Sequence, residues 1–99
     1  MESTNRHQEV LKEIEKFNKD RHWGQHHSPA NLAKSIVLEA AELLENFQWS
    51  DEDYDESSVQ EELADVLIYS YQLAMRMGWD DDELVMKKIA LNGKKYPVE

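Results

Sequence analysis

Apolar residues recur along the chain at intervals of three and four, which is the period of an α-helix and not that of a β-strand. Only three glycines and two prolines interrupt this pattern. It predicts an all-α fold with four helices. They are expected at residues 4–20, at 28 to about 48, from 57 or 58 to about 77, and from 80 to a C-terminal tail at 92–97.

Polar residues and glycine at the predicted boundaries support these helices. A side-chain oxygen can cap the free N–H groups of a first turn, proline is tolerated at the first helical position, and glycine allows a left-handed stop. The signals are Ser28-Pro29 before the second helix, Ser57 or Ser58 before the third, Gly78 after the third and Asp80 before the fourth.

The third helix is apolar on almost all sides beyond Asp65. A helix of this kind is usually buried on both sides, so one side is predicted to meet another subunit. The chain is therefore expected to be one domain over residues 1–99. Its four-helix bundle-like protomer is expected to assemble through its helices as a homodimer or a homotetramer, a dimer of dimers.

Charge and composition narrow the function classes. The chain carries a net charge of -10, which argues against a nucleic-acid partner, since phosphate backbones require a basic face. No apolar stretch approaches the ~20 residues of a membrane helix, and the polar N-terminus lacks a signal-peptide core. Cysteine is absent. We therefore expect a cytoplasmic protein with neither a membrane partner nor thiolate metal ligands.

The negative charge is concentrated between Lys34 and Arg76, where eleven acidic residues occur without a single Lys or Arg. Two pairs of these acids are spaced three residues apart beside the apolar stripes of the second and third helices. The pairs are Glu39 with Glu42 and Glu62 with Asp65. At about 100° per residue, Glu39 lies only about 20° from the apolar position Leu32. The two helices are thus predicted to present inward-facing carboxylates to each other.

Facing carboxylates repel one another unless a proton or a cation neutralises them, and oxygen ligands favour Mg²⁺, Mn²⁺ or Ca²⁺. Mg²⁺ is the expected ion, with Mn²⁺ as a possible substitute. Solvated helix faces are the alternative, as is usual for acids at this spacing. A di-iron bundle would instead require Glu-x-x-His pairs, which these helices lack.

Several motifs then resemble one family along most of the chain. They are Arg21-x-Trp23-x-Gln25-x-His27-x-Pro29-x-Asn31-Leu32, the segment from Glu39 to Trp49, the segment from Glu61 to Tyr69, and Asn92-Gly93-Lys94-Lys95-Tyr96-Pro97-Val98. Together they resemble the MazG-like all-α nucleoside triphosphate pyrophosphohydrolases, in particular the dCTP pyrophosphatase branch.

The resemblance implies Mg²⁺-dependent hydrolysis of a nucleoside triphosphate to the monophosphate and pyrophosphate, a house-cleaning activity on the nucleotide pool. The family's metal ligands fall on Glu39, Glu42, Glu62 and Asp65. Glu39 or Glu42 would orient the attacking water or take its proton, and the sequence does not choose between them. The preferred substrate would be dCTP or another pyrimidine or modified deoxynucleotide.

The expected substrate-binding residues fall into two groups. Trp23, His27, Asn31, Trp49 and Tyr69 would form the pocket for the base and sugar, since aromatic faces stack on bases and amide or imidazole groups address their polar edges. Lys88, Asn92, Lys95 and Tyr96 lie where family members contact the nucleotide.

Two points limit this expectation. Some dCTP-preferring relatives carry a polar base-contacting residue where this chain has Ile14, which leaves room for a broader range of deoxynucleotides. The alternative function is a non-catalytic, acidic protein-interaction module. The position of Glu39, Glu62 and Asp65 beside apolar stripes argues against it, because such a module needs exposed acids.

Overall fold

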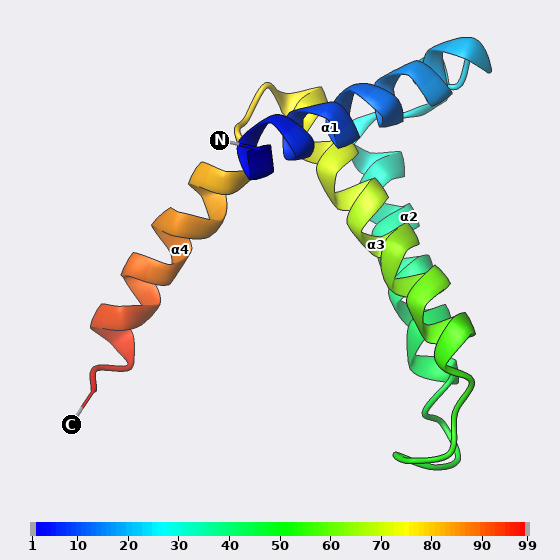
Figure 1. The fold of residues 1–99 in the computed structure, drawn as a ribbon, viewed down its shortest axis with the longest axis vertical. Coiled ribbons are helices and arrows are strands. Elements are labelled where there is room, and N and C mark those ends of the chain that lie inside the picture. The colour runs from blue at the N-terminus through cyan, green and yellow to red at the C-terminus, as the bar shows by residue number, and fades with distance from the viewer. Residues whose placement is uncertain (1, 99) are drawn as a thin grey trace.

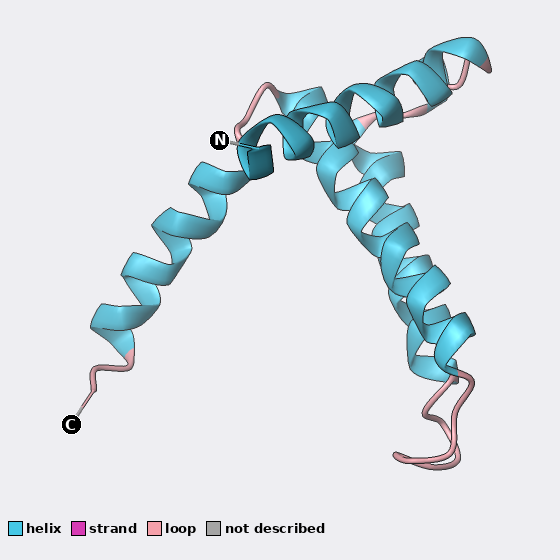
Figure 2. Ribbon diagram, in the orientation of Figure 1, coloured by secondary structure: helices cyan, strands magenta, loops and turns pink. Residues whose placement is uncertain are grey.

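The computed structural model describes residues 2–98, with side chains described from Arg6 onward. Four α-helices and one short 3-10 helix account for most of these residues, and the described chain contains no strand, as Figure 2 shows. The all-α prediction is therefore confirmed. The helices are α1 (Glu2–Asp20), α2 (Pro29–Glu45), α3 (Glu56–Met77) and α4 (Asp81–Lys95), with the 3-10 helix η1 (Gly24–His26) between α1 and α2.

Three of the predicted boundary signals are confirmed. The Ser28 side chain accepts a hydrogen bond from the backbone N–H of Asn31, and the Asp80 side chain accepts one from Glu83. Gly78 ends α3 with a φ of 77°, and the next N–H, that of Trp79, donates to the Ala74 carbonyl at 2.9 Å. This left-handed stop is the reason for a glycine at this position.

Other boundaries were predicted wrongly. The N-cap of α3 is Asp55, whose carboxylate accepts from the Ser57 N–H, and neither Ser57 nor Ser58 caps the helix. The second helix ends at Glu45, and residues 46–48 continue as turns with carbonyl partners three residues back. The fourth helix extends through 92–95, so four of the six residues of the predicted tail are helical.

The helices α2 and α3 pack along each other as an antiparallel pair, and α1 crosses one end of this pair (Figure 1). The most buried side chains come from these three helices: Ile14, Leu32, Gln72 and Ala74. Leu32 is only 1% exposed, as expected for the first apolar position of α2. The core therefore lies where α1 crosses the α2–α3 pair.

The last helix, α4, diverges from the α2–α3 pair, and its C-terminal end lies far from both helices (Figure 1). A long-range tie holds its first turn, because His7 Nε2 of α1 lies 2.8 Å from Asp81 Oδ2. The His7 ring also packs edge-on against Tyr71 of α3, with ring centroids 5.3 Å apart. The direction of α4 is thus fixed at its N-terminal end alone.

The resulting shape is open. The Cα radius of gyration is 16.0 Å, whereas a compact domain of this length has one of roughly 13 Å. The accessible surface is 8358 Å², roughly 40% more than the roughly 5,900 Å² of a folded monomer of this mass. None of the helices in the described part is both long and apolar enough to cross a membrane.

Candidate metal centre and adjoining cavity

The four predicted metal ligands lie on the facing sides of α2 and α3. Glu39, Glu62 and Asp65 are partly buried, whereas Glu42 is exposed. The helical period places each pair one turn apart, and the antiparallel packing of α2 on α3 brings the two pairs opposite each other.

The electrostatics of Glu39 report how close these groups are. Its pKa rises from the usual 4.5 to about 7, first because Glu42 hydrogen-bonds its protonated side chain, and then because of burial. The negative charges of Glu42, Asp65 and Glu62 add to the rise. A cation bound among these carboxylates would offset the part of this rise that comes from the three like charges.

Two residues to which the sequence assigned no role in the site hold Glu62 in place. Asn46 Nδ2 donates to Glu62 Oε2 at 3.1 Å, and Ser58 Oγ lies 3.1 Å from Glu62 Oε1. Both oxygens of this carboxylate are thereby oriented from the end of α2 and from the preceding turn of α3. Such outer contacts fix ligand direction in metal sites. The only sequence signal was the proximity of Asn46 and Ser58 to the acidic motifs.

The donor set fits a hard divalent cation, since all four groups offer carboxylate oxygen. Among the described residues, the potential ligand atoms that lie within 4.8 Å of one another are those of His7, Asp81 and Asp82, not those of the four carboxylates. Glu39 and Glu42 are close enough for the hydrogen bond that raises the pKa of Glu39, but no three of the four carboxylates come within this distance of one another. The His7 group is already engaged in the contact that ties α1 to α4.

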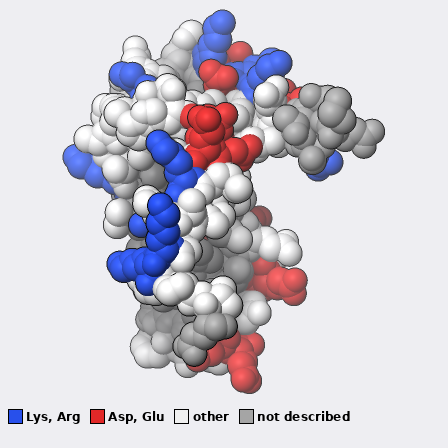
Figure 3. Space-filling view, turned by 90° about the vertical axis from the view of Figure 1, so that its left-hand side faces the viewer, with Lys and Arg blue, Asp and Glu red and all other residues white. Residues whose placement is uncertain are grey.

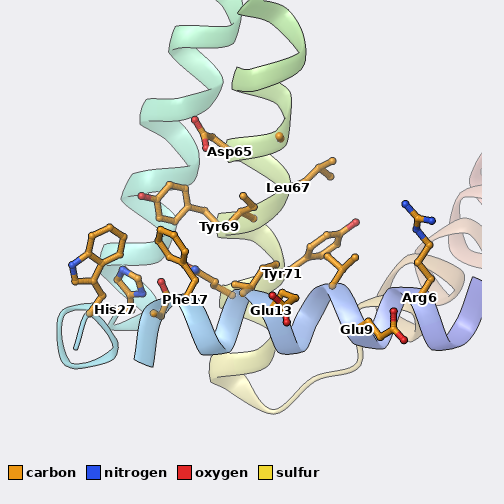
Figure 4. A pocket seen from close by; sticks show the side chains of 16 residues that line it. Arg6, Glu9, Glu13, Phe17, His27, Asp65, Leu67, Tyr69 and Tyr71 are labelled. Atoms are coloured by element: carbon orange, nitrogen blue, oxygen red, sulfur yellow. The ribbon is translucent and has the colours of Figure 1, made fainter. Parts of the chain in front are cut away.

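A cavity of about 930 Å³ adjoins the carboxylates between α1 and α3 (Figure 4). Asp65 and Tyr69 line it from α3, and both are labelled in Figure 4 on the same helix, one turn apart. Phe17, Trp23 and His27 continue the lining from the end of α1 and the following loop. One cavity is therefore lined both by Asp65 and by aromatic side chains.

Edge-on aromatic contacts connect these side chains into one wall. The ring centroids are 5.5 Å apart for Phe17 and Trp23, 6.5 Å for Trp23 and His27, and 6.4 Å for His27 and Tyr69. Burial raises the pKa of Tyr69, and the charges of Glu39 and Asp65 raise it further. Tyr69 thus stands between the aromatic wall and the carboxylates.

The predicted base and sugar residues divide into two sets. Trp23, His27 and Tyr69 line the cavity. Asn31 instead supports the loop, because its Nδ2 donates to the His26 carbonyl at 3.0 Å. Trp49 is 89% exposed, does not line the cavity, and follows the far end of α2. Within one chain, the structure does not bring Asn31 and Trp49 to the other three.

The predicted nucleotide contacts on α4 are not brought to the carboxylates of their own chain either, because α4 diverges. Lys88, Asn92 and Lys95 lie along this helix and Tyr96 follows it. Figure 3 shows Lys and Arg side chains gathered along the face that α4 contributes, below a cluster of acidic side chains. The first turn of α4 is acidic and its last turn basic, as its dipole favours.

The cavity also contains residues that the sequence did not reveal as functional. Phe17 and Gln72 line it, beside Ile14, the position at which some relatives carry a base-contacting residue. Gln72 carried no signal at all, because a lone glutamine on a helix is usually solvated. Its burial becomes visible only in the folded chain.

Comparisons with known proteins identify the family and the fold of the chain. The sequence model of the MazG-like family matches residues 34–99. The chain is 37% identical over 91 residues to dCTP pyrophosphatase 1 of Bos taurus, covering 83% of this chain and 54% of that protein. It is 38% identical over 90 residues to dCTP pyrophosphatase 1 of Homo sapiens, covering 82% and 53%. The chain thus spans about half the length of the curated relatives it matches.

A solved structure is similar over nearly the whole chain. The crystal structure of a pyrophosphatase from Archaeoglobus fulgidus superposes with a TM-score of 0.88 at 40% sequence identity. The match covers 94% of each chain.

Proposed function

Since the chain belongs to the MazG-like family, we propose that it is a Mg²⁺-dependent nucleoside triphosphate pyrophosphohydrolase. It would cleave a deoxynucleoside triphosphate between the α and β phosphates and release the monophosphate and pyrophosphate. The observation that carries this proposal is that Asp65, one of the four proposed metal ligands, lines the same cavity as Tyr69 and the aromatic side chains.

The carboxylates have distinct tasks in this proposal. Glu39, Glu42, Glu62 and Asp65 would hold the ion, with Asn46 and Ser58 orienting Glu62. Bound Mg²⁺, or Mn²⁺ in its place, supplies charge neutralisation for the triphosphate and acidifies an attacking water. Glu39 or Glu42 would take the proton of that water.

The cavity would hold the base and sugar. Trp23 and His27 offer ring faces or edges to a base, and Tyr69 lies between them and the carboxylates, where the sugar would lie. The relatives named dCTP pyrophosphatase 1 support a preference for dCTP or another pyrimidine deoxynucleotide. The biological role would be the removal of unwanted deoxynucleotides from the nucleotide pool.

We further propose that the protein acts as a homodimer or a dimer of dimers. Its surface is far larger than that of a compact monomer, and large apolar side chains on α2 and α4 are open to solvent. Val37, Leu44 and Met86 are each 65% exposed or more. Burying such side chains between copies would be favourable. In this assembly the nucleotide bound at the carboxylates of one copy would be contacted by residues from α4 and the tail of the other copy, namely Lys88, Asn92, Lys95 and Tyr96. Trp49 would lie at the interface.

Pyrophosphate release tests the proposed activity. The purified protein should release pyrophosphate, and not orthophosphate, from dCTP in the presence of Mg²⁺, and chelation should stop the reaction. Glu42→Gln and Asp65→Asn should abolish turnover, whereas the exposed control Glu45→Gln should keep it. Failure to hydrolyse every member of a panel of natural and base-modified deoxynucleotides would refute the proposal.

A mixing experiment tests whether α4 serves a second copy. Asp65→Asn and Lys95→Ala chains should each be inactive, but co-refolding them should restore up to about a quarter of wild-type activity. Half of the dimers would then be mixed, and each mixed dimer would have one intact site. No recovery, with both variants assembled normally, would show that each site uses residues of one chain.

A further inference from the structure

Three side chains that can ligate a metal ion come together where the N-terminal part of α1 lies beside the start of α4 (Figure 1). They are His7, Asp81 and Asp82, and each offers one donor atom, so that all three atoms lie within 4.8 Å of one another. His7 Nε2 lies 2.8 Å from Asp81 Oδ2 and 3.8 Å from Asp82 Oδ1. This group combines a nitrogen donor from one helix with two oxygen donors from another.

A simple ion pair does not account for both carboxylates. One carboxylate is enough for a hydrogen bond to a histidine, yet two consecutive residues of α4 approach the His7 ring. Successive positions on a helix are about 100° apart, so neighbouring side chains ordinarily point in different directions. The preceding acid has another task, because Asp80 accepts a hydrogen bond from the Glu83 N–H at 3.2 Å. Asp80 therefore caps the helix, whereas Asp81 and Asp82 are left to share His7.

The surroundings hold two of these ligands in place and leave the third open. The His7 ring packs edge-on against Tyr71, with ring centroids 5.3 Å apart. The side chains of His7 and Asp81 are only 26% and 19% exposed, whereas that of Asp82 is 76% exposed. A site that is open on one side can take up an ion from solution and keep a water molecule as its fourth ligand.

We propose that His7, Asp81 and Asp82 bind a divalent transition-metal ion, with Zn²⁺ as the expected ion. Imidazole nitrogen together with carboxylate oxygen suits Zn²⁺, whereas Mg²⁺ prefers oxygen ligands alone. At Zn–N and Zn–O distances of about 2.1 Å, tetrahedral donor atoms are about 3.4 Å apart. That separation lies between the 2.8 Å and the 3.8 Å that His7 Nε2 makes with the two carboxylates. The Nε2 lone pair binds the ion when the ring proton is on Nδ1, so coordination replaces the hydrogen bond to Asp81.

The task of this ion is structural. Its ligands join residues 74 positions apart, and the contact between His7 and Asp81 is what holds the N-terminal end of α4. Coordination by three ligands in place of one hydrogen bond fixes the start of α4 against α1 more firmly. The site shares no ligand with the four carboxylates of α2 and α3, so it does not rest on the proposed function.

Titration calorimetry with Zn²⁺ tests this site, in excess Mg²⁺ to compete for the four carboxylates. The wild-type protein should bind one Zn²⁺ per chain at this site, and His7→Ala and Asp82→Ala should each weaken this binding by at least about tenfold. Asp82→Ala keeps the contact between His7 and Asp81, so it tests the site even if His7→Ala disturbs the packing of α1.

Two variants serve as matched controls. Glu83→Ala removes an acidic side chain from the same turn of α4. His22→Asn removes an imidazole from a loop position with a φ of 56°, which asparagine tolerates. Both should bind Zn²⁺ as the wild-type protein does.

Two further measurements locate the ion and its effect. The ¹⁵N resonance of His7 Nε2 should shift on addition of Zn²⁺ and not on addition of Mg²⁺. Amide hydrogen exchange in the first turns of α4 should slow at saturating Zn²⁺, because the ion holds this end of the helix.

The outcomes separate this site from the four carboxylates. Zn²⁺ affinity that is equal in the wild type, His7→Ala and Asp82→Ala would overturn the proposal. Binding that is lost in Glu39→Gln but kept in Asp82→Ala would assign the ion to the four carboxylates and would also overturn it. Unchanged exchange in α4 with Zn²⁺ bound would refute the structural task. None of these measurements uses a nucleotide, so their failure leaves the proposed function untouched.

Discussion

Neutralising Glu39 should stabilise the metal-free protein, because its negative charge is repelled by the neighbouring carboxylates. The perturbation is Glu39→Gln, which keeps the size of the side chain and removes its negative charge. The pKa of Glu39 is about 7 in the folded chain and 4.5 as the usual reference. The folded state therefore binds this proton more tightly than the unfolded state.

The sign and size of the effect follow from this difference. The contribution of protonated Glu39 to stability is complete below about pH 4.5 and is lost as the pH rises through 7. The full shift corresponds to about 3 kcal/mol. Solvent reaches part of this side chain, and screening reduces the expected effect to about 1–2 kcal/mol. At pH 8 the Glu39→Gln protein should therefore unfold about 5–10 °C above the wild-type protein.

The assay is thermal unfolding followed by far-UV circular dichroism with a chelator present, at pH 4.5, 6 and 8. The difference between Glu39→Gln and wild type should grow with pH and be small at pH 4.5. Glu45→Gln is the control, since Glu45 is exposed at the end of α2. Adding Mg²⁺ at pH 8 should then raise the Tm of the wild-type protein more than that of the variant. A difference independent of pH would refute this account of the centre.

Three further predictions concern contacts outside the four carboxylates. Asn46→Ala removes the hydrogen bond to Glu62 and should weaken Mg²⁺ affinity about tenfold, measured by titration calorimetry, with little change in helix content. A double-mutant cycle with His7→Ala and Asp81→Ala should give a coupling free energy of about 1 kcal/mol in urea unfolding, and additivity would contradict the 2.8 Å contact. Gly78→Ala should destabilise by about 1 kcal/mol because of the φ of 77°, and an unchanged urea midpoint would contradict this.

The helices could be predicted from the sequence because their signals are local. Ser28, Gly78 and Asp80 each act within four residues, and the structure confirms all three. The start of α3 was predicted wrongly because aspartate and serine are about equally good caps, so the sequence of Asp55 and Ser57 does not rank them.

The direction of α4 could not be predicted, since it depends on a contact between residues 74 positions apart, His7 and Asp81. Periodicity says which face of a helix is apolar, but not what covers that face. For the same reason, periodicity does not tell whether a second copy covers an apolar face, so the assembly stays a prediction. The cytoplasmic location also stays a prediction.

The candidate site was predictable to the extent that it follows helical period. Glu39 was placed beside an apolar stripe by counting, and its carboxyl group is partly buried in the structure, with a pKa raised by the neighbouring acids. Asn46 and Gln72 were missed because amide side chains are common on helix surfaces, and only the folded chain shows that Asn46 bonds Glu62 and that Gln72 is buried. The role of Lys88 and Lys95 at the carboxylates stays a prediction, because within one chain α4 diverges from α2 and α3.

The stretch between Lys34 and Arg76 lacks any basic residue, and this absence has an evolutionary consequence. A lysine on the inner side of α2 or α3 would be an easy stabilising mutation, since it would provide a permanent counter-charge. It would also occupy the position that the proposed function reserves for an exchangeable ion. Selection for activity would therefore oppose selection for stability at these positions, and the helix pair would remain less stable than its fold allows.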